Sequence, residues 1–461
     1  MSIKVVFVHY HLRSGGVGTV IRRQASAMAR LGHAVVIASG EPDATRADGI
    51  EHSVLPGLGY RDQPMPAAAI AALASSLVRL AGGGVLHFHN PTIGKNPSWP
   101  DLIALLAARG QPMVLQVHDF IEDGRASRAG FPERSRWYPL AAHLRWLTLN
   151  DTGARVLHRA GMPMDMVCTI PNPVCAMPLP DGPVDPGLIL YPTRGLKRKN
   201  PGECALLAAL LPPGHRIATT LAPENPRQAR GQARWQIFAR RAGLPVSFAN
   251  GWPAGRPARC LSTSIQEGFG LALAEPWLNG IPVSGRWLAE ATSTLARVGW
   301  DRGDAYAAIT VPSSWIPRAA LRTAVDAACG GLDVDAIMAC HFNAPSMDFG
   351  RLPVFLQRRV VRLVHRDSRA YHSIRMTMPD GRDLDAPAWL AGWNAPGDDT
   401  IATNRQILRT HCHPVAIARM LAGHYKCVLD ARPALHGHAD AAMVWRAFHS
   451  PERFHFLRLP P

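Results

Sequence analysis

The sequence has 461 residues, which is long enough for two domains that each bury an apolar core. Its formal net charge is +16, mostly through arginine, but the basic residues form no concentrated tract, so a nucleic-acid-binding arm is not predicted. A basic surface of this kind is compatible with anionic membranes or phosphorylated substrates. The eight cysteines include no Cys-x-x-Cys pair, so neither a zinc ribbon nor a disulfide framework is predicted.

The amino-terminal apolar run is too short for a signal peptide, because His9 and His11 interrupt it. No uncharged run reaches the roughly 20 residues of a membrane span. We therefore expect a cytoplasmic protein. Peripheral association with an anionic membrane at its inner face is a further expectation, which rests on the positive net charge.

The chain opens with a strand, a glycine-rich loop, a helix and a second strand. The strands are expected at residues 3–8 and 34–38, and the helix at 19–31, after Gly15 and Gly16. This order is typical of the start of a doubly wound α/β fold. The glycine spacing is not G-x-G-x-x-G, so a dinucleotide site is not the favoured interpretation.

Further buried-type strands are expected at residues 85–88 and 112–117, followed by a strand-like run at 147–150. His118 directly follows the second of these strands. Because α/β sheets place ligands at the carboxyl ends of their strands, His118 is a candidate site residue. A histidine at such a position that only packs in the core is an equally simple interpretation.

A proline-rich stretch at residues 171–186 is expected to link the domains, and a strand at 188–191 begins the second one. Arg194 and Lys199 lie between that strand and a helix at 201–211. Two cations at a strand end can bind phosphate, because arginine offers a bidentate fork and lysine a point charge. The alternative is a solvated basic turn.

The most informative stretch is a strand at residues 261–265, a glycine turn at 266–270 and a helix at 271–278. Such a unit holds phosphates, because glycines admit an anion close to the backbone and the helix presents free N–H groups. Glu267 and Glu275 flank the turn, and each carboxylate can accept hydrogen bonds from vicinal hydroxyls. The unit therefore suits a sugar nucleotide.

The sequence EGFGLALAE at residues 267–275 resembles the Glu–seven residues–Glu motif of retaining GT-B glycosyltransferases, glycosyltransferase family 4 in particular. The resemblance implies that Glu267 meets the donor sugar and Glu275 the ribose. It also implies that Arg194 and Lys199 neutralise the diphosphate and that His118 orients the sugar. Donor contacts from the two glycine loops are implied for Gly268, Phe269, Gly270, Leu271, Gly15 and Gly16.

The resemblance covers roughly residues 1–300 and implies two Rossmann-like domains facing a cleft. The expected division is an N-terminal acceptor-side domain (1–175), a linker (176–186), a nucleotide-sugar domain (187–365) and an extension (366–461) whose helices return to the N-terminal domain. The implied reaction transfers a sugar, with retention, from a UDP- or GDP-sugar to an acceptor hydroxyl. No cofactor, metal or nucleic acid is expected.

Two features keep other functions open. The segment between Gly251 and Leu261 is shorter than in apparent relatives, which leaves a non-catalytic sugar-nucleotide-binding protein as an alternative. An epimerase or a phosphorylase on the same scaffold is another. Four His-x-His pairs also admit a zinc-dependent hydrolase, because residues i and i+2 share a face of a strand, although no third ligand is evident. The pairs are His9/His11, His87/His89, His411/His413 and His436/His438.

Overall fold

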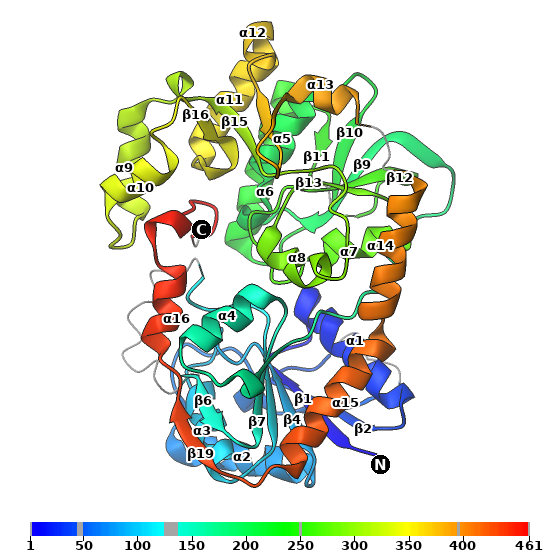
Figure 1. Cartoon of the computed structure of the whole chain (residues 1–461), viewed down its shortest axis with the longest axis vertical. Coiled ribbons are helices and arrows are strands. Elements are labelled where there is room, and N and C mark those ends of the chain that lie inside the picture. The colour runs from blue at the N-terminus through cyan, green and yellow to red at the C-terminus, as the bar shows by residue number, and fades with distance from the viewer. Residues whose placement is uncertain (1, 44–48, 124–136, 249–250, 394–396, 460–461) are drawn as a thin grey trace.

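The computed structural model describes residues 2–43, 49–123, 137–248, 251–393 and 397–459. Two α/β units, each built on a parallel sheet, lie one above the other in Figure 1. We call the unit built on the first sheet the N-terminal half and the unit built on the second the C-terminal half.

Seven described strands form the first sheet, in the order β3-β2-β1-β4-β5-β7-β8. All neighbouring strands within it are parallel. The central strand β1 is buried on both faces, which explains its continuous apolar sequence. The strands are β1 (Lys4–His9), β2 (Ala34–Ser39), β3 (Glu51–Val54), β4 (Val85–His89), β5 (Met113–Val117), β7 (Leu144–Thr148) and β8 (Val167–Thr169). The helices are α1 (Gly16–Arg30), α2 (Ala67–Ala81), α3 (Trp99–Ala108) and α4 (Asp151–Arg159).

The second sheet has the order β11-β10-β9-β12-β13-β14 among the described residues and is also parallel. Its strands are β9 (Val184–Arg194), β10 (Arg216–Leu221), β11 (Val246–Ser247), β12 (Arg256–Ser262), β13 (Val283–Arg286) and β14 (Ala305–Tyr306). The single-turn helix η5 (Lys197–Lys199) and the helices α5 (Pro201–Leu210), α6 (Pro226–Ala242), α7 (Leu271–Leu278) and α8 (Ala289–Ala296) connect them.

Two details of this sheet differ from expectation. The strand expected at residues 261–265 is β12, which starts five residues earlier and ends at Ser262, so the segment before Glu267 is irregular. Strand β9 begins at Val184, inside the linker expected at 176–186. The division of the chain into domains at those residues stays a prediction.

A small antiparallel sheet extends the C-terminal half. It has the order β16-β15-β17-β18. Its strands are β15 (Ala308–Pro312), β16 (Ser346–Asp348), β17 (Arg375–Thr377) and β18 (Asp383–Asp385), and α9 (Arg318–Ala328), α10 (Val334–His341), α11 (Val354–Arg366), α12 (Ser368–Tyr371) and α13 (Ala386–Ala391) accompany them. Arg286 joins this sheet to the larger one, because it pairs with buried Glu203 at 2.5 Å and with Asp348 at 2.8 Å.

The last part of the chain returns to the N-terminal half along one side of the molecule (Figure 1). Helix α14 (Asp398–His411) packs on α7, and α15 (Pro414–Asp430) packs on α1 and the first sheet. Pro414 occupies the first position of α15, where its missing N–H costs no helical hydrogen bond. Leu421 and Tyr425 of α15 are buried in the same apolar cluster as Phe7 of β1, so α15 completes the core of the N-terminal half.

The final elements lie on the opposite side of the molecule (Figure 1). Strand β19 (Leu435–His438) pairs with β6 (Pro139–Ala141), and α16 (Ala441–Phe448) packs on α4. After η8 (Pro451–Arg453), residues 454–459 form a C-terminal tail that touches both halves. Arg458 pairs with Asp123 at 3.1 Å, and the Leu459 carbonyl accepts a 3.3 Å hydrogen bond from Lys197. Among the described residues, no helix combines the length and apolar character needed to cross a bilayer.

Candidate active site

The turn between β12 and α7 lies at the carboxyl end of the second sheet. Gly270 adopts φ 77°, a left-handed conformation that favours glycine, and no side chain caps the helix that follows. The Phe269 side chain is buried with Leu273 and Trp277, which anchors the turn to α7. The turn therefore offers main-chain groups and the positive end of a helix dipole, while the Phe269 ring faces the core.

Glu267 and Lys199 form an ion pair at this turn. The Lys199 ammonium bonds Oε1 of Glu267, and Ser264 donates a 2.7 Å hydrogen bond to the same oxygen. Burial alone would raise the pKa of Glu267, but Lys199 and Arg198 hold that pKa below its ordinary value. Burial lowers the pKa of Lys199 despite the attraction of Glu267. Among the described residues no hydrogen bond uses Oε2 of Glu267, so the second oxygen of an ionised carboxylate is available to a ligand.

The backbone around Lys199 is held by both neighbouring strands. Tyr191 of β9 and Thr263 after β12 donate hydrogen bonds to the Lys199 carbonyl, at 3.1 and 2.9 Å. Asn200 adopts a left-handed conformation and caps α5 by accepting from the Glu203 N–H. Lys199 is thus fixed at the point where η5 gives way to α5.

Arg194, at the end of β9, reaches across to the N-terminal half. Its guanidinium donates to the carbonyl of Ser14 at 2.8 Å and to the Ser14 hydroxyl at 3.0 Å, and it pairs with Glu224 at 3.0 Å. A side chain built at Gly15 would approach Arg194 to 3.8 Å, and Gly16 begins α1. The predicted glycine loop and the predicted arginine therefore lie together.

Glu275 also meets the N-terminal half. It pairs with Arg23 of α1 at 2.6 Å, and Arg23 donates a further hydrogen bond to the Pro173 carbonyl at 3.0 Å. Burial raises the pKa of Glu275 and outweighs the opposite effect of Arg23. A ribose at this carboxylate would share it with Arg23.

His118 is buried at the carboxyl end of β5. The main-chain N–H of His118 donates a 2.7 Å hydrogen bond to Oδ1 of Asn90. Its ring atom Nε2 lies 2.8 Å from Nδ1 of His89. A Cβ at Gly268 would stand 2.5 Å from the His118 carbonyl oxygen, and Asn150 donates a 2.6 Å hydrogen bond to the Gly268 carbonyl. The glycine turn of the C-terminal half thus touches the N-terminal half directly.

This close approach predicts that Gly268→Ala destabilises the protein. The added methyl group would collide with the backbone of His118, and relief requires a backbone shift at the contact between the halves. We expect a loss of about 1–3 kcal/mol in the free energy of unfolding, measured by urea denaturation. Gly423→Ala on α15 is the control, because nothing lies within 4 Å of its Cβ position. An unchanged unfolding free energy for Gly268→Ala would contradict the contact.

The sequence did not predict that His9, His87 and His89 lie together with His118. We call these four residues the histidine stack. The rings of His87 and His89 are stacked at 4.4 Å, those of His89 and His118 at 5.1 Å, and His9 bonds the His89 carbonyl at 3.1 Å. His87 bonds the Tyr425 hydroxyl at 2.7 Å. The alternation of histidines on β4 was the available signal, since i and i+2 share a face.

Burial dominates the electrostatics of the histidine stack. It lowers the pKa of His9 and of His87 to about 3 and that of His118 to about 4, the last despite the attraction of Asp119. Burial also holds the pKa of His89 well below its ordinary value. Within the described ranges, no group of three or more His, Cys, Asp or Glu side chains is placed to hold a metal ion, so the hydrolase alternative finds no ligand set there.

Comparison with known proteins adds to this geometry. Residues 14–176 match the model of the family described as Glycosyltransferase Family 4. Over 319 residues the chain is 24% identical to the mannosylglucosyl-3-phosphoglycerate synthase of Petrotoga mobilis. That match covers 59% of this chain and 62% of the relative, so the chain spans less than two thirds of that protein.

Solved structures match over nearly the whole chain. A glycosyltransferase from Rickettsia africae aligns with a TM-score of 0.55 at 14% identity, covering 93% of this chain and 99% of that one. The Anabaena protein Alr3699/HepE, solved in complex with UDP and glucose, aligns with a TM-score of 0.52 at 14% identity, covering 92% and 99%. At this identity the likeness concerns the fold, two Rossmann-like domains. The chain therefore has the GT-B fold, and its residues 14–176 are similar to glycosyltransferase family 4.

Proposed function

We propose that this protein transfers a sugar, with retention at the anomeric carbon, from a nucleoside-diphosphate sugar to an acceptor hydroxyl. The observation that carries the proposal is the buried Lys199–Glu267 pair at the turn before α7. An ionised carboxylate beside a fixed cation, with a helix N-terminus next to them, matches a sugar linked to a diphosphate. The similarity to glycosyltransferases supports the same reaction class.

In this mechanism Oε2 of Glu267 accepts hydrogen bonds from the donor sugar, while Lys199 and Arg194 stabilise the charge on the leaving diphosphate. Main-chain N–H groups from Gly268 to Leu271 face the sugar and phosphates. The bond between the anomeric carbon and the diphosphate oxygen breaks, and the acceptor oxygen bonds the same face of the sugar. The acceptor proton passes to the leaving phosphate oxygen.

Contributions from the N-terminal half complete the site. The contact of Gly268 with His118 supports a role for His118 in orienting the sugar. Because the pKa of His118 is about 4, its ring is neutral near pH 7 and acts as a hydrogen-bonding group without charge. The loop of Gly15 and Gly16 borders the diphosphate through Arg194. Contact between the halves would exclude water from the donor.

The direct test is incubation with radiolabelled UDP-glucose and GDP-mannose in the presence of candidate hydroxyl acceptors. Labelled glycoside whose anomeric configuration matches the donor by NMR would support the proposal. Inverted product would contradict retention.

A non-catalytic sugar-nucleotide-binding protein is a second candidate, and one observation favours it. The described residues between β11 and β12, which are 248 and 251–255, contain no helix, and this region is short in the sequence. Saturable binding of a sugar nucleotide without turnover, in any acceptor mixture, would support this candidate over the first.

Glu275 and Arg194 are expected to affect different kinetic constants. Glu275→Ala should raise the KM for the donor about tenfold with little change in kcat, because a ribose contact is the same in ground state and transition state. Arg194→Ala should lower kcat, because the charge it meets develops during the reaction. Steady-state kinetics on both variants test this split.

Arg23→Ala is the control for Glu275, since it removes the same ion pair and leaves the carboxylate in place. If Glu275 served only to hold the two halves together, both variants would raise KM equally. A larger rise for Glu275→Ala identifies a direct ribose contact.

A further inference from the structure

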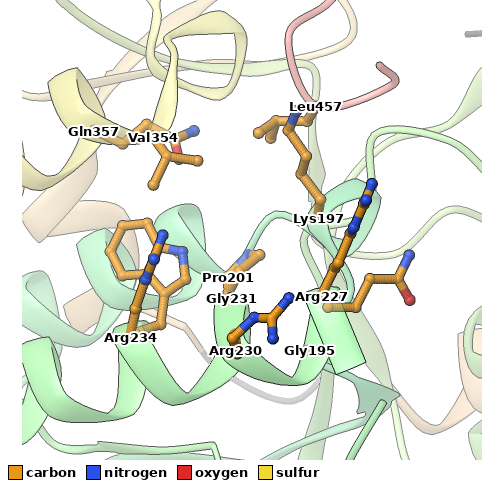
Figure 2. Close-up of a pocket in the computed structure, with 12 residues that line it drawn as sticks. Gly195, Lys197, Pro201, Arg227, Arg230, Gly231, Arg234, Val354, Gln357 and Leu457 are labelled. Carbon is orange, nitrogen blue, oxygen red and sulfur yellow. The ribbon is translucent and has the colours of Figure 1, made fainter. Parts of the chain in front are cut away.

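A cavity of about 470 Å³ lies in the C-terminal half, and none of the predicted site residues lines it. Its walls come from η5, α5, α6 and α11, and the C-terminal tail contributes Leu457 (Figure 2). Its volume falls within the range of small-molecule pockets, roughly 300–1,000 Å³. It is therefore large enough for a compact ligand.

The charged side chains around this cavity are all basic. Lys197 approaches from η5, and Arg227, Arg230 and Arg234 extend from one face of α6 (Figure 2). Among the described residues that line the cavity there is no aspartate or glutamate. We call these four residues the basic cluster.

Without a bound anion, the positions of the three arginines of the basic cluster are electrostatically unfavourable. They are spaced by three and four residues, so like charges face each other on the helix, at a cost of about 0.2–0.5 kcal/mol per pair. Arg227 lies in the first turn of α6, where the helix dipole also opposes a cation. Within the described part of the chain, none of the three guanidinium groups donates a hydrogen bond or pairs with a carboxylate.

Three arginines at the contact between the two halves differ in this respect. Arg23, Arg194 and Arg198 each pair with a carboxylate of the protein. An anion in the cavity would supply the counter-charge that the basic cluster lacks. Arginine binds phosphate oxygens through two parallel hydrogen bonds, so phosphate groups fit this cluster best.

We propose that the cavity is a second anion site, which binds the phosphate or diphosphate group of a small molecule. The basic cluster would grip the phosphate oxygens. Trp235, Val354 and Leu457 would cover the less polar part of the ligand. The proposal does not depend on sugar transfer, because it concerns binding at residues outside the Glu267 site.

Calorimetric titration with inorganic pyrophosphate at low salt tests the site. We expect two binding events in the unmodified protein, one at each site. Arg227→Gln/Arg230→Gln should weaken one event at least about tenfold, since it removes two charge-assisted contacts. Lys199→Gln should weaken the other. Circular dichroism verifies that the exposed substitutions on α6 leave the fold intact.

Arg240→Gln/Arg241→Gln is the matched control, because it removes the same charge from exposed positions of the same helix outside the cavity. It should retain both events. Equal weakening by the two double variants, unaltered binding in Arg227→Gln/Arg230→Gln, or a single event that disappears with Lys199→Gln would each overturn the proposal.

Vesicle flotation distinguishes a free phosphate compound from a lipid headgroup. Vesicles of phosphatidylglycerol and of phosphatidylcholine are compared with the same two double variants. Preferential loss of phosphatidylglycerol binding by Arg227→Gln/Arg230→Gln assigns the site to a lipid phosphate. If the two double variants bind the vesicles equally but still differ in pyrophosphate affinity, the site binds a soluble compound.

Discussion

Lys199→Ala is expected to lower kcat for sugar transfer by about 10²–10³-fold, the loss typical when one preorganised donor to a developing charge is removed. Tyr191 and Thr263 hold the backbone of Lys199, and Glu267 holds its ammonium group. No reorganisation of Lys199 is therefore needed when the diphosphate leaves. Its loss also leaves the largely buried Glu267 with fewer positive neighbours, which raises the pKa of that carboxyl. Steady-state kinetics with a saturating donor measure the effect.

Two further variants separate chemistry from structure. The fold reduction in kcat for Lys199→Ala/Glu267→Ala should be much smaller than the product of the two single-variant reductions. The effects of two contacting residues in one site are not additive. Lys426→Ala, an exposed lysine on α15, should keep the unmodified kcat. A Lys199→Ala protein that melts normally and retains kcat within threefold would refute the assigned role.

A second large effect is expected on stability in mild acid. The histidine stack is neutral in the folded protein, with pKa values of about 3 for His9 and His87 and about 4 for His118. In the unfolded chain these groups bind protons below about pH 6.5. The unfolded state then holds more protons, so stability is lost as the pH falls from about 6.5 toward the folded pKa values.

At pH 5 this linkage amounts to about 2 kcal/mol for each of these histidines, against a typical total stability of 5–15 kcal/mol. Urea unfolding at pH 7 and pH 5 measures the loss. His87→Gln should reduce the loss of unfolding free energy between pH 7 and pH 5 by the contribution of one histidine, about 2 kcal/mol. His411→Gln, an exposed control, should leave that loss unchanged. A pH slope that survives unaltered in His87→Gln would contradict the linkage.

The sequence predicted those parts of the site that depend on local pattern. The bounds of α7 at residues 271–278 are confirmed, because Gly270 before it and Asn279 after it are strong local signals. The opening strand, helix and strand are confirmed in type and order, although α1 begins at Gly16, three residues before its predicted start. The family resemblance implied that Lys199 and Glu267 share a site, and their functional roles remain predictions.

Contacts between the halves were not predictable from one sequence. The Arg23–Glu275 pair joins helices 252 residues apart, and nothing local to α1 indicates its partner. The histidine stack depends on how β1, β4 and β5 lie in register, which pattern alone does not give. Strands β17 and β18 are three residues each, too short for a detectable period.

The route of the chain has a consequence for biosynthesis. The N-terminal half needs α15 to cover Phe7 and its neighbours, and β19 and α16 also dock there, yet these elements are made last. At about 5–20 residues per second, translation of the intervening chain leaves that apolar surface uncovered on the ribosome for tens of seconds. The N-terminal half, although it is synthesised first, therefore cannot complete its core until the end of the chain has been made.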